Sequence, residues 1–362
     1  MTDTSITLGL LIDRSLDRGF RQGFELWRTT INGAGGECGR IVQVIASGSN
    51  GVPTALPEAY LDTARDVLGY VTLADSGDAA ALAEYAGGDG VPAVTTMGVS
   101  EQLAHPGPVV IGPTNDIMAI NAFAYLQNAH QVGGGPVGVM SDGSTAADDS
   151  LNGLRWAAEQ AKVTLDVREA GVTPSSWGAA TAVFSFASPA DTVSLLTSVP
   201  STVTVMTTLD GYDPGLIAAN PAAAAAVADK RLLVVTATPA LGSDHPAAAA
   251  VAAAFTAAGG TDPGPRLLEG YAAGAMWGRL LDAACTAADL TRSGVADSMT
   301  TIGAAPIDSV LGPTDPGLVV NGHQPATRLT AIAAVDLSAP TGLAPLTWLE
   351  AAPNVGDYKP NP

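Results

Sequence analysis

The stretch Ile6-Thr7-Leu8-Gly9-Leu10-Leu11-Ile12-Asp13 is an apolar run that ends in a charge, a pattern that predicts a buried β-strand. Large apolar side chains then recur at spacings of four, three and four residues, at Phe20, Phe24, Trp27 and Ile31. This spacing places them on one face of a helix. Residues 33–36 are rich in glycine and can end that helix in the left-handed cap conformation. Because a second apolar run follows at 41–46, the first fifty residues predict the start of a parallel α/β sheet.

Predicted strands and helices keep alternating along the rest of the chain. In the first part we expect strands at 69–73, 92–96 and 109–113 and helices at 56–67 and 79–86. In the second part we expect strands at 136–140, 165–167, 183–187, 203–207 and 232–236 and helices at 117–128, 151–161 and 190–196. Two further helices, at 245–258 and 267–287, and a late strand at 329–335 follow. The 362 residues exceed one compact α/β domain and suit two lobes, each with a parallel, Rossmann-like sheet.

The composition excludes several classes of protein. With 47% hydrophobic and 14% charged residues, the chain has enough apolar side chains for a large core. The net charge of -19 repels phosphate backbones, so we expect no nucleic-acid partner. No apolar run reaches the roughly 18–20 residues of a membrane span. The N-terminus lacks the basic, apolar and small-residue pattern of a signal peptide.

No catalytic or cofactor motif stands out. The chain lacks G-x-S-x-G, G-x-x-x-x-G-K-[ST] and H-E-x-x-H. Gly133-Gly134-Gly135 follows a predicted helix rather than a strand, unlike a dinucleotide-binding loop. The four histidines, at positions 105, 130, 245 and 323, lie far apart and have no ligand-like neighbours. We therefore expect neither enzymatic activity, nor a metal, nor a cofactor.

The stretch from Ile31 to Arg40, INGAGGECGR, resembles the INAAGGxxGR motif that is typical of the branched-chain amino-acid (Leu/Ile/Val) binding proteins. These are type I periplasmic binding proteins, the extracellular receptors of ABC importers. The order of predicted elements agrees with that family over residues 5–340. The resemblance implies two lobes joined by a three-crossing hinge, with a ligand cleft between them. Lobe one would comprise 1–114 and 241–318, and lobe two 115–240 and 319–362.

The same resemblance implies a function. The protein would bind an amino acid or another small carboxylate-bearing solute by hinge closure and present it to ABC permease subunits. It would act as a monomer outside the cytoplasm, in the periplasm or as a cell-surface lipoprotein, after removal of a signal peptide. The alternative is a ligand-sensing regulatory protein of the same fold, responding to an amide or a nutrient.

Candidate ligand-binding residues follow the predicted strands of lobe one, because ligands of open parallel sheets bind beyond the carboxyl ends of the strands. Arg14 offers a planar fork for a carboxylate, or it is a solvated arginine or one paired with Asp13. Ser76 stands where the family places a carboxylate-binding serine, and a helix N-cap is its alternative role.

After the fourth strand of lobe one, Thr95 and Thr96 keep hydroxyl groups where the family commonly reads SPxATxP. Gly98 lies in the same loop and completes this group of candidates. Val99 replaces the usual hydroxyl residue, which argues against a standard α-amino-acid clamp.

In lobe two, Ala146 and Ala187 stand where the family often has aromatic residues, and Phe186 is close to the second of these positions. Asp210 falls where branched-chain amino-acid binders place an acid that pairs with the ligand ammonium. Its alternative role is an Asx turn before a glycine. Tyr212 can supply a ring and a hydroxyl group to the ligand.

The chain has two cysteines, Cys38 and Cys285, whose separation fits no metal site. In the family's topology both fall in lobe one. One disulfide and two separate buried thiols are the two alternatives.

Overall fold

The structure is a computed structural model of the 362-residue chain. It describes residues 2–13, 18–48, 55–74, 76–104, 108–132, 135–171, 177, 180–229, 231–302 and 310–360. The chain divides into two compact units, each built from separate segments. Lobe one contains Met1–Thr114 and Ala250–Thr327, and lobe two contains Asn115–Ala249 and Arg328–Pro360. The change at residue 249 lies within helix α9 (Pro246–Ala257).

Lobe one is built on a five-stranded parallel sheet in the order β2-β1-β3-β4-β5. Its strands are β1 (Ser5–Ile12), β2 (Ile41–Gly48), β3 (Gly69–Leu73), β4 (Ala93–Thr95) and β5 (Val109–Val110). Its helices are α1 (Phe20–Gly33), α2 (Ala55–Thr63), α3 (Ser76–Gly88), the 3-10 helix η1 (Ser100–Ala104), α10 (Leu267–Thr286), α11 (Arg292–Ile302) and α12 (Pro316–Gly322). The first fifty residues thus form the parallel strand–helix–strand unit that their apolar pattern predicts.

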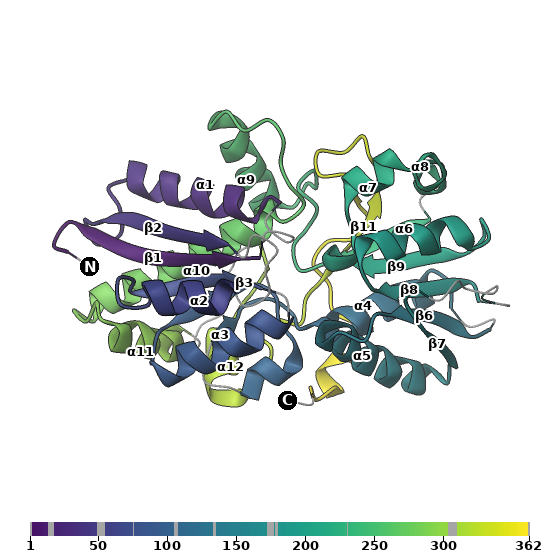
Figure 1. The fold of residues 1–362 in the computed structure, drawn as a ribbon, viewed down its shortest axis with the longest axis horizontal. Coiled ribbons are helices and arrows are strands. Elements are labelled where there is room, and N and C mark those ends of the chain that lie inside the picture. Colours follow the sequence, from purple (N-terminus) through teal and green to yellow (C-terminus); the bar gives the residue numbers. More distant parts are fainter. Residues whose placement is uncertain are drawn as a thin grey trace. The chain divides into compact units, whose positions relative to one another are not determined.

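Helices cover both faces of this sheet (Figure 1). On one face, α2 and α3 pack on β1, β3 and β4 through a core that includes Leu11, Tyr60, Tyr70 and Leu82. On the other face, α1 and α10 pack against each other. Phe20, Phe24 and Trp27 are buried there, as their helical spacing predicts. Lobe one therefore has the helix–sheet–helix layers of a doubly wound α/β domain.

Two glycines bring α1 and α10 into backbone contact. A Cβ atom added at Gly23 would lie 1.8 Å from the carbonyl oxygen of Leu267. One added at Gly270 would lie 1.9 Å from the carbonyl oxygen of Phe20. Glycine is required at both positions because no other residue leaves room for the facing backbone.

A disulfide bond joins Cys38, in the turn after α1, to Cys285, near the end of α10. The two Cα atoms are 6.3 Å apart, and the sequence separation is 247 residues. The bond therefore ties the N-terminal segment of lobe one to the segment that returns to it late in the chain.

Lobe two is built on a seven-stranded sheet in the order β12-β11-β10-β9-β8-β6-β7. Its strands are β6 (Val137–Ser141), β7 (Leu165–Glu169), β8 (Ala182–Phe186), β9 (Thr204–Thr208), β10 (Leu232–Thr236), β11 (Ala331–Val335) and β12 (Leu343–Pro345). Strands β6 to β10 are parallel, whereas β11 pairs antiparallel with both of its neighbours, β10 and β12. The prediction of two α/β lobes with parallel sheets is confirmed, and the two last strands refine it.

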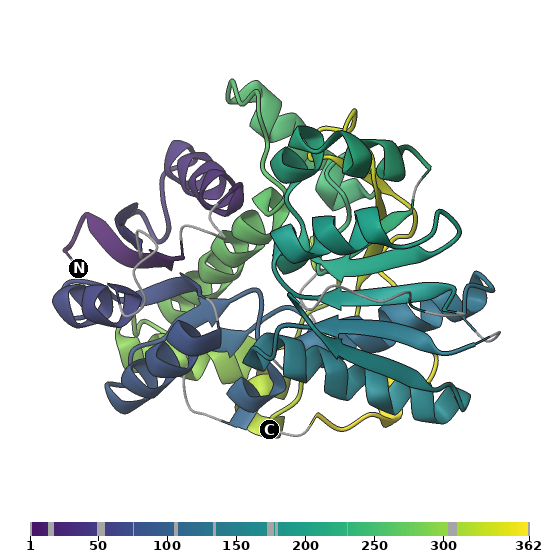
Figure 2. The ribbon, with the colours of Figure 1, turned by 45° about the vertical axis from the view of Figure 1, so that its right-hand side comes forward.

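The inner strands of the lobe-two sheet, from β6 to β11 without the edge strand β7, are buried on both faces, and successive residues point to opposite cores. Val139, Phe184 and Met206 pack against α4 (Asn115–Asn128) and α5 (Thr145–Ala161). On the other face lie α6 (Pro189–Ser198), α7 (Pro214–Ala219) and α8 (Pro221–Ala228), packed on Val183 and Val205 among others. Figure 2 shows this layer of helices on each side of the sheet. The continuous apolar runs of these strands follow from burial on both faces.

Candidate functional site

A pocket of about 90 Å³ lies in lobe two, at the carboxyl ends of β6, β8 and β9. Its polar lining residues are Asn115, Asp142, Ser144, Ser150, Ser188, Thr208 and Asp210. Its apolar lining residues are Ala146, Ala147, Phe186 and Ala187. The pocket is smaller than the 300–1,000 Å³ of sites that enclose a whole drug-sized molecule, so it fits one small group of a ligand.

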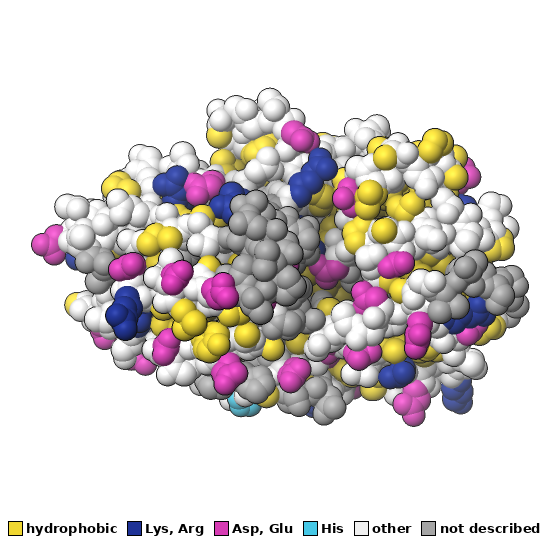
Figure 3. All heavy atoms as spheres, in the orientation of Figure 1, with side chains coloured by type: hydrophobic (Ala, Val, Ile, Leu, Met, Phe, Trp, Pro, Cys, Tyr) yellow, Lys and Arg dark blue, Asp and Glu magenta, His cyan; other side chains and the backbone are white. Residues whose placement is uncertain are grey.

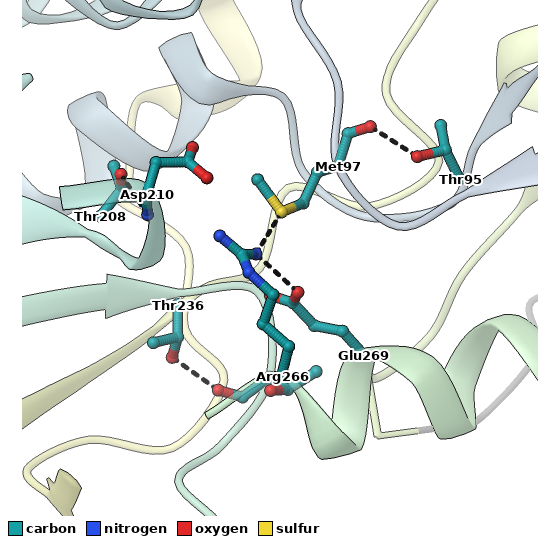
Figure 4. Close-up of polar contacts among 8 residues, drawn as sticks. Thr95, Met97, Thr208, Asp210, Thr236, Arg266 and Glu269 are labelled. Atoms are coloured by element: carbon teal, nitrogen blue, oxygen red, sulfur yellow. Dashed lines mark hydrogen bonds and ion pairs between the residues drawn. The ribbon is translucent and has the colours of Figure 1, made fainter. Parts of the chain in front are cut away.

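The strand ends and the following helix starts position these side chains. Ser144 caps α5, its hydroxyl accepting a hydrogen bond from the Ala147 amide at 3.2 Å. The Asp142 carboxylate accepts one from the Ser144 amide at 2.9 Å. At the end of β9, the Thr208 hydroxyl accepts one from the Asp210 amide at 3.2 Å, and Figure 4 shows these two residues side by side. Each turn is built by its own side chains, so the pocket's polar rim is ordered locally.

The charge of the pocket is one-sided. Two carboxylates, Asp142 and Asp210, and several hydroxyl groups line it, and its described lining residues include no lysine, arginine or histidine. Phe186 adds an aromatic ring. Carboxylates beside an aromatic ring attract a cationic group, because both the charge and the ring face interact favourably with it.

Ala146 and Ala187, the positions at which the resemblance implies aromatic residues in the family, both line this same pocket. Phe186 and Asp210 from the predicted site therefore meet in one place, together with the positions that the resemblance singled out.

Tyr212 lies elsewhere in lobe two. Its ring is buried in the core beneath α6, α7 and α8. Its hydroxyl lies 2.9 Å from the carbonyl oxygen of Gly342 and 3.2 Å from that of Thr341. Donation to these carbonyls holds the turn between β11 and β12. Tyr212 is not among the described lining residues of the pocket.

In lobe one, the end of β4 and the loop after it contain three predicted residues. The Thr95 hydroxyl donates to the carbonyl oxygen of Met97 at 2.9 Å. Thr96 is fully buried, and its hydroxyl has no partner among the described residues. A Cβ atom at Gly98 would lie 2.5 Å from the Gln102 side-chain oxygen, so this loop position suits glycine.

A buried ion pair lies beside this loop. Arg266 and Glu269, at the start of α10, are 4% and 1% exposed. Their Nη1 and Oε2 atoms are 2.8 Å apart. The same Nη1 contacts the sulfur of Met97 (Figure 4). The sequence analysis did not identify Arg266, although the Arg-x-x-Glu spacing at a helix start was a usable signal.

Two predicted residues fall outside what the structure describes. Arg14 lies in the undescribed segment 14–17. The backbone of Ser76 begins α3, but its side chain is outside the described part. Their proposed roles stay predictions.

Metal and membrane sites do not emerge from the described residues. No group of three or more His, Cys, Asp or Glu side chains there is placed to hold a metal ion. The described helices include none that combines the length and apolarity needed to cross a bilayer. Acidic side chains are spread over the visible face of the molecule, consistent with the net charge of -19 (Figure 3).

Comparison with solved structures shows what this fold is similar to. A fatty acid ABC transporter substrate-binding protein from Thermomonospora curvata superimposes with a TM-score of 0.87 at 22% identity, covering 100% of this chain and 96% of that one. A leucine-binding protein from Thermotoga maritima superimposes with a TM-score of 0.76 at 14% identity, covering 96% of this chain and 98% of that one. A solute-binding protein from Rhodopseudomonas palustris, in complex with p-hydroxybenzoic acid, superimposes with a TM-score of 0.74 at 14% identity, covering 96% of this chain and 97% of that one. At these identities the likeness establishes the fold.

A comparison with curated proteins gives no match. A family described as periplasmic binding protein matches residues 5–338, which is most of the chain. Together with the two α/β lobes, this match confirms the resemblance seen in residues 31–40, and the chain belongs to the periplasmic binding protein family.

Proposed function

We propose that this protein is a solute-binding receptor of an ABC importer and that its solute is an amino acid or a related small carboxylate. The observation that carries the proposal is the lobe-two pocket at the carboxyl ends of β6, β8 and β9. Ligands of open parallel sheets bind at this edge. Family membership supports the receptor role.

The acidic pocket supports an ammonium-bearing ligand. Asp210 is the proposed partner of the ammonium group, with Asp142 adding negative charge nearby and Phe186 offering its ring. The small volume, about 90 Å³, suits the charged end of a molecule. Ala146 and Ala187 leave room for a group beside it.

Lobe one has candidate partners of its own for a carboxylate. Arg266 supplies a guanidinium group beside the loop after β4, and Thr96 supplies a buried hydroxyl. The solved relatives support this part of the proposal, because a fatty acid, leucine and p-hydroxybenzoic acid all carry a carboxyl group. Closure of the two lobes on the solute stays a prediction from the family resemblance.

A thermal-shift screen over the common amino acids, aromatic acids and fatty acids tests the proposal, because a ligand that binds only the folded state raises the melting temperature. We expect an amino acid to give the largest shift. Asp210→Ala should then weaken the binding of that amino acid by roughly 2–5 kcal/mol, which is a loss of affinity of about 30- to 5,000-fold.

Asp213→Ala is the matched control. Asp213 lies three residues further along and caps α7 by accepting from the Gly215 amide at 2.7 Å, but it is not among the pocket residues. Its loss should lower the melting temperature and leave the affinity unchanged. A shift with aromatic or fatty acids alone would refute the ammonium pairing and leave a carboxylate receptor that depends on lobe one.

A further inference from the structure

Lobe one contains a second chamber, of about 310 Å³, away from the loop after β4. Its walls include Val91 and Pro92, just before β4, and Val109, at the start of β5. The chamber therefore lies at the amino-terminal ends of these strands. Since β4 and β5 are parallel, this is the edge of the sheet opposite to Thr95, Thr96 and Gly98.

Helices from distant parts of the chain form the walls of the chamber, which is open to solvent, since the lining residues Ala296, Val320 and His323 are exposed. Ala86 comes from α3, Met299 from α11 and Val319 from α12. Helix α12 packs against both α11 and β5. In Figure 1, α3, α11 and α12 lie together in the lower part of lobe one. The volume falls in the range of small-molecule sites.

The lining is apolar with one exception. Among the described residues that line the chamber, His323 is the one whose side chain can form hydrogen bonds. Its Nδ1 lies 2.6 Å from the carbonyl oxygen of Leu103, another lining residue. A carbonyl oxygen only accepts, so Nδ1 carries the hydrogen of the neutral ring. The Nε2 atom, to which no described residue is bonded, is then an acceptor.

The backbone holds His323 in this place. Helix α12 ends there, with His323 in the left-handed conformation at φ 49° and its amide donating to the Val319 carbonyl. Asp315 caps the other end of the helix by accepting from the Gly317 amide at 3.0 Å. The caps thus hold the backbone of His323, and the hydrogen bond to the Leu103 carbonyl holds its exposed ring at the chamber wall.

We propose that this chamber is a second binding site, for a small apolar molecule that carries one hydroxyl group, such as an alkylphenol. The apolar walls supply the burial, and Nε2 of His323 accepts the hydroxyl hydrogen. The occupant differs from an amino acid in lacking a charge, because the described walls include no aspartate, glutamate, lysine or arginine.

Methyl NMR of the full chain labelled with [methyl-13C]methionine tests this site, with 4-ethylphenol as the probe. Met299 lines the chamber, whereas Met97 lies in the loop after β4. We expect 4-ethylphenol to shift the Met299 resonance, assigned with Met299→Leu, in a saturable way and to leave Met97 unchanged. Ethylbenzene, which has the same shape without the hydroxyl, should bind about tenfold more weakly.

Two variants make the test specific. Ala296→Trp places a large ring on α11 at the chamber wall and should abolish the Met299 shift. Ser293→Trp, exposed on the same helix and outside the lining, is its control. His323→Asn, a residue type that tolerates left-handed backbone, should remove the preference for 4-ethylphenol over ethylbenzene.

An unsaturable or absent Met299 shift, an unchanged affinity in Ala296→Trp, or equal affinities for the two probes in the unaltered protein would overturn the proposal. A shift at Met97 instead would place the probe at the β4 loop and would also overturn it. Each result is independent of the amino-acid screen, so the two proposals fail separately.

Discussion

Gly270→Ala tests the close packing of α1 and α10, the helix pair that carries Arg266 to the loop after β4. Alanine has a higher helix propensity than glycine, by about 1 kcal/mol, so the change would stabilise an open helix. Here the new Cβ atom would lie 1.9 Å from the carbonyl oxygen and 2.7 Å from the carbonyl carbon of Phe20. Both atoms belong to the α1 backbone, which a side-chain rotation cannot move.

Overpacking of this kind costs typically 1–3 kcal/mol. Subtracting the gain in helix propensity leaves a net loss in the free energy of unfolding of up to about 2 kcal/mol. We expect a value near this upper limit, because the clash is with backbone atoms. For a lobe of this size, that corresponds to a melting temperature lower by roughly 4–8 °C. Differential scanning calorimetry measures the change.

Gly33→Ala is the matched control, because an added Cβ atom at Gly33, the last residue of α1, has nothing within 4 Å. We expect its melting temperature to stay equal or rise. If Gly270→Ala also melts at or above the temperature of the unaltered protein, the close approach of α1 and α10 is refuted. Arg266 would then not be positioned by this packing.

Two further predictions concern the same lobe. Replacing Cys38 and Cys285 together by serine should lower the free energy of unfolding by about 2–5 kcal/mol, measured by urea titration; an unchanged midpoint and slope would show that the bond contributes nothing. Burial first, and the nearby Asp282 second, raise the pKa of the Glu37 carboxyl. The stability that the protonated Glu37 carboxyl contributes is therefore present at acid pH and lost as the pH rises through the folded-state pKa. Glutamine resembles the protonated carboxyl, so Glu37→Gln should have a higher melting temperature than the unaltered protein at pH 7 and an equal one near pH 4. Equal melting temperatures at both pH values would contradict this.

Sequence patterns predicted the repeating part of the fold. Strand β1 and helix α1 were expected from one apolar run and one helical spacing, because burial imposes those periods directly. Helix α2 was expected over 56–67 and ends at Thr63. Arg292, from α11, contacts the carbonyl oxygens of Ala64 and Val67, the latter at 2.7 Å. A partner more than 220 residues away thus satisfies the backbone where the helix stops, and no local pattern contains that information.

The short helices α11 and α12 were not predicted. Helix α11 contains Gly294 and Thr300, which have low helix propensity, and packing of Val295 and Met299 holds it. Helix α12 has seven residues, too few for a periodic signal. Both line the second chamber, which is why that chamber could not be expected from sequence.

The candidate site was predictable only in part. Phe186 and Asp210 were expected from the family resemblance, and both line the lobe-two pocket. Arg266 was not: the Arg-x-x-Glu spacing marks its pairing with Glu269, but its contact with Met97, 169 residues away, has no local signal. Tyr212 is a residue type common in ligand sites, but its hydroxyl donates to backbone carbonyls of the turn between β11 and β12. Which polar side chain faces a ligand and which holds a turn depends on contacts that residue type alone does not specify.

We propose above that Asp210 in the lobe-two pocket recognises an ammonium group. Calorimetric titration with the amino acid that binds best and with its desamino analogue, on the unaltered protein and on Asp210→Ala, tests it most directly. We expect the unaltered protein to prefer the amino acid by about 30-fold or more and Asp210→Ala to lose that preference. An equal preference in both proteins would contradict the claim.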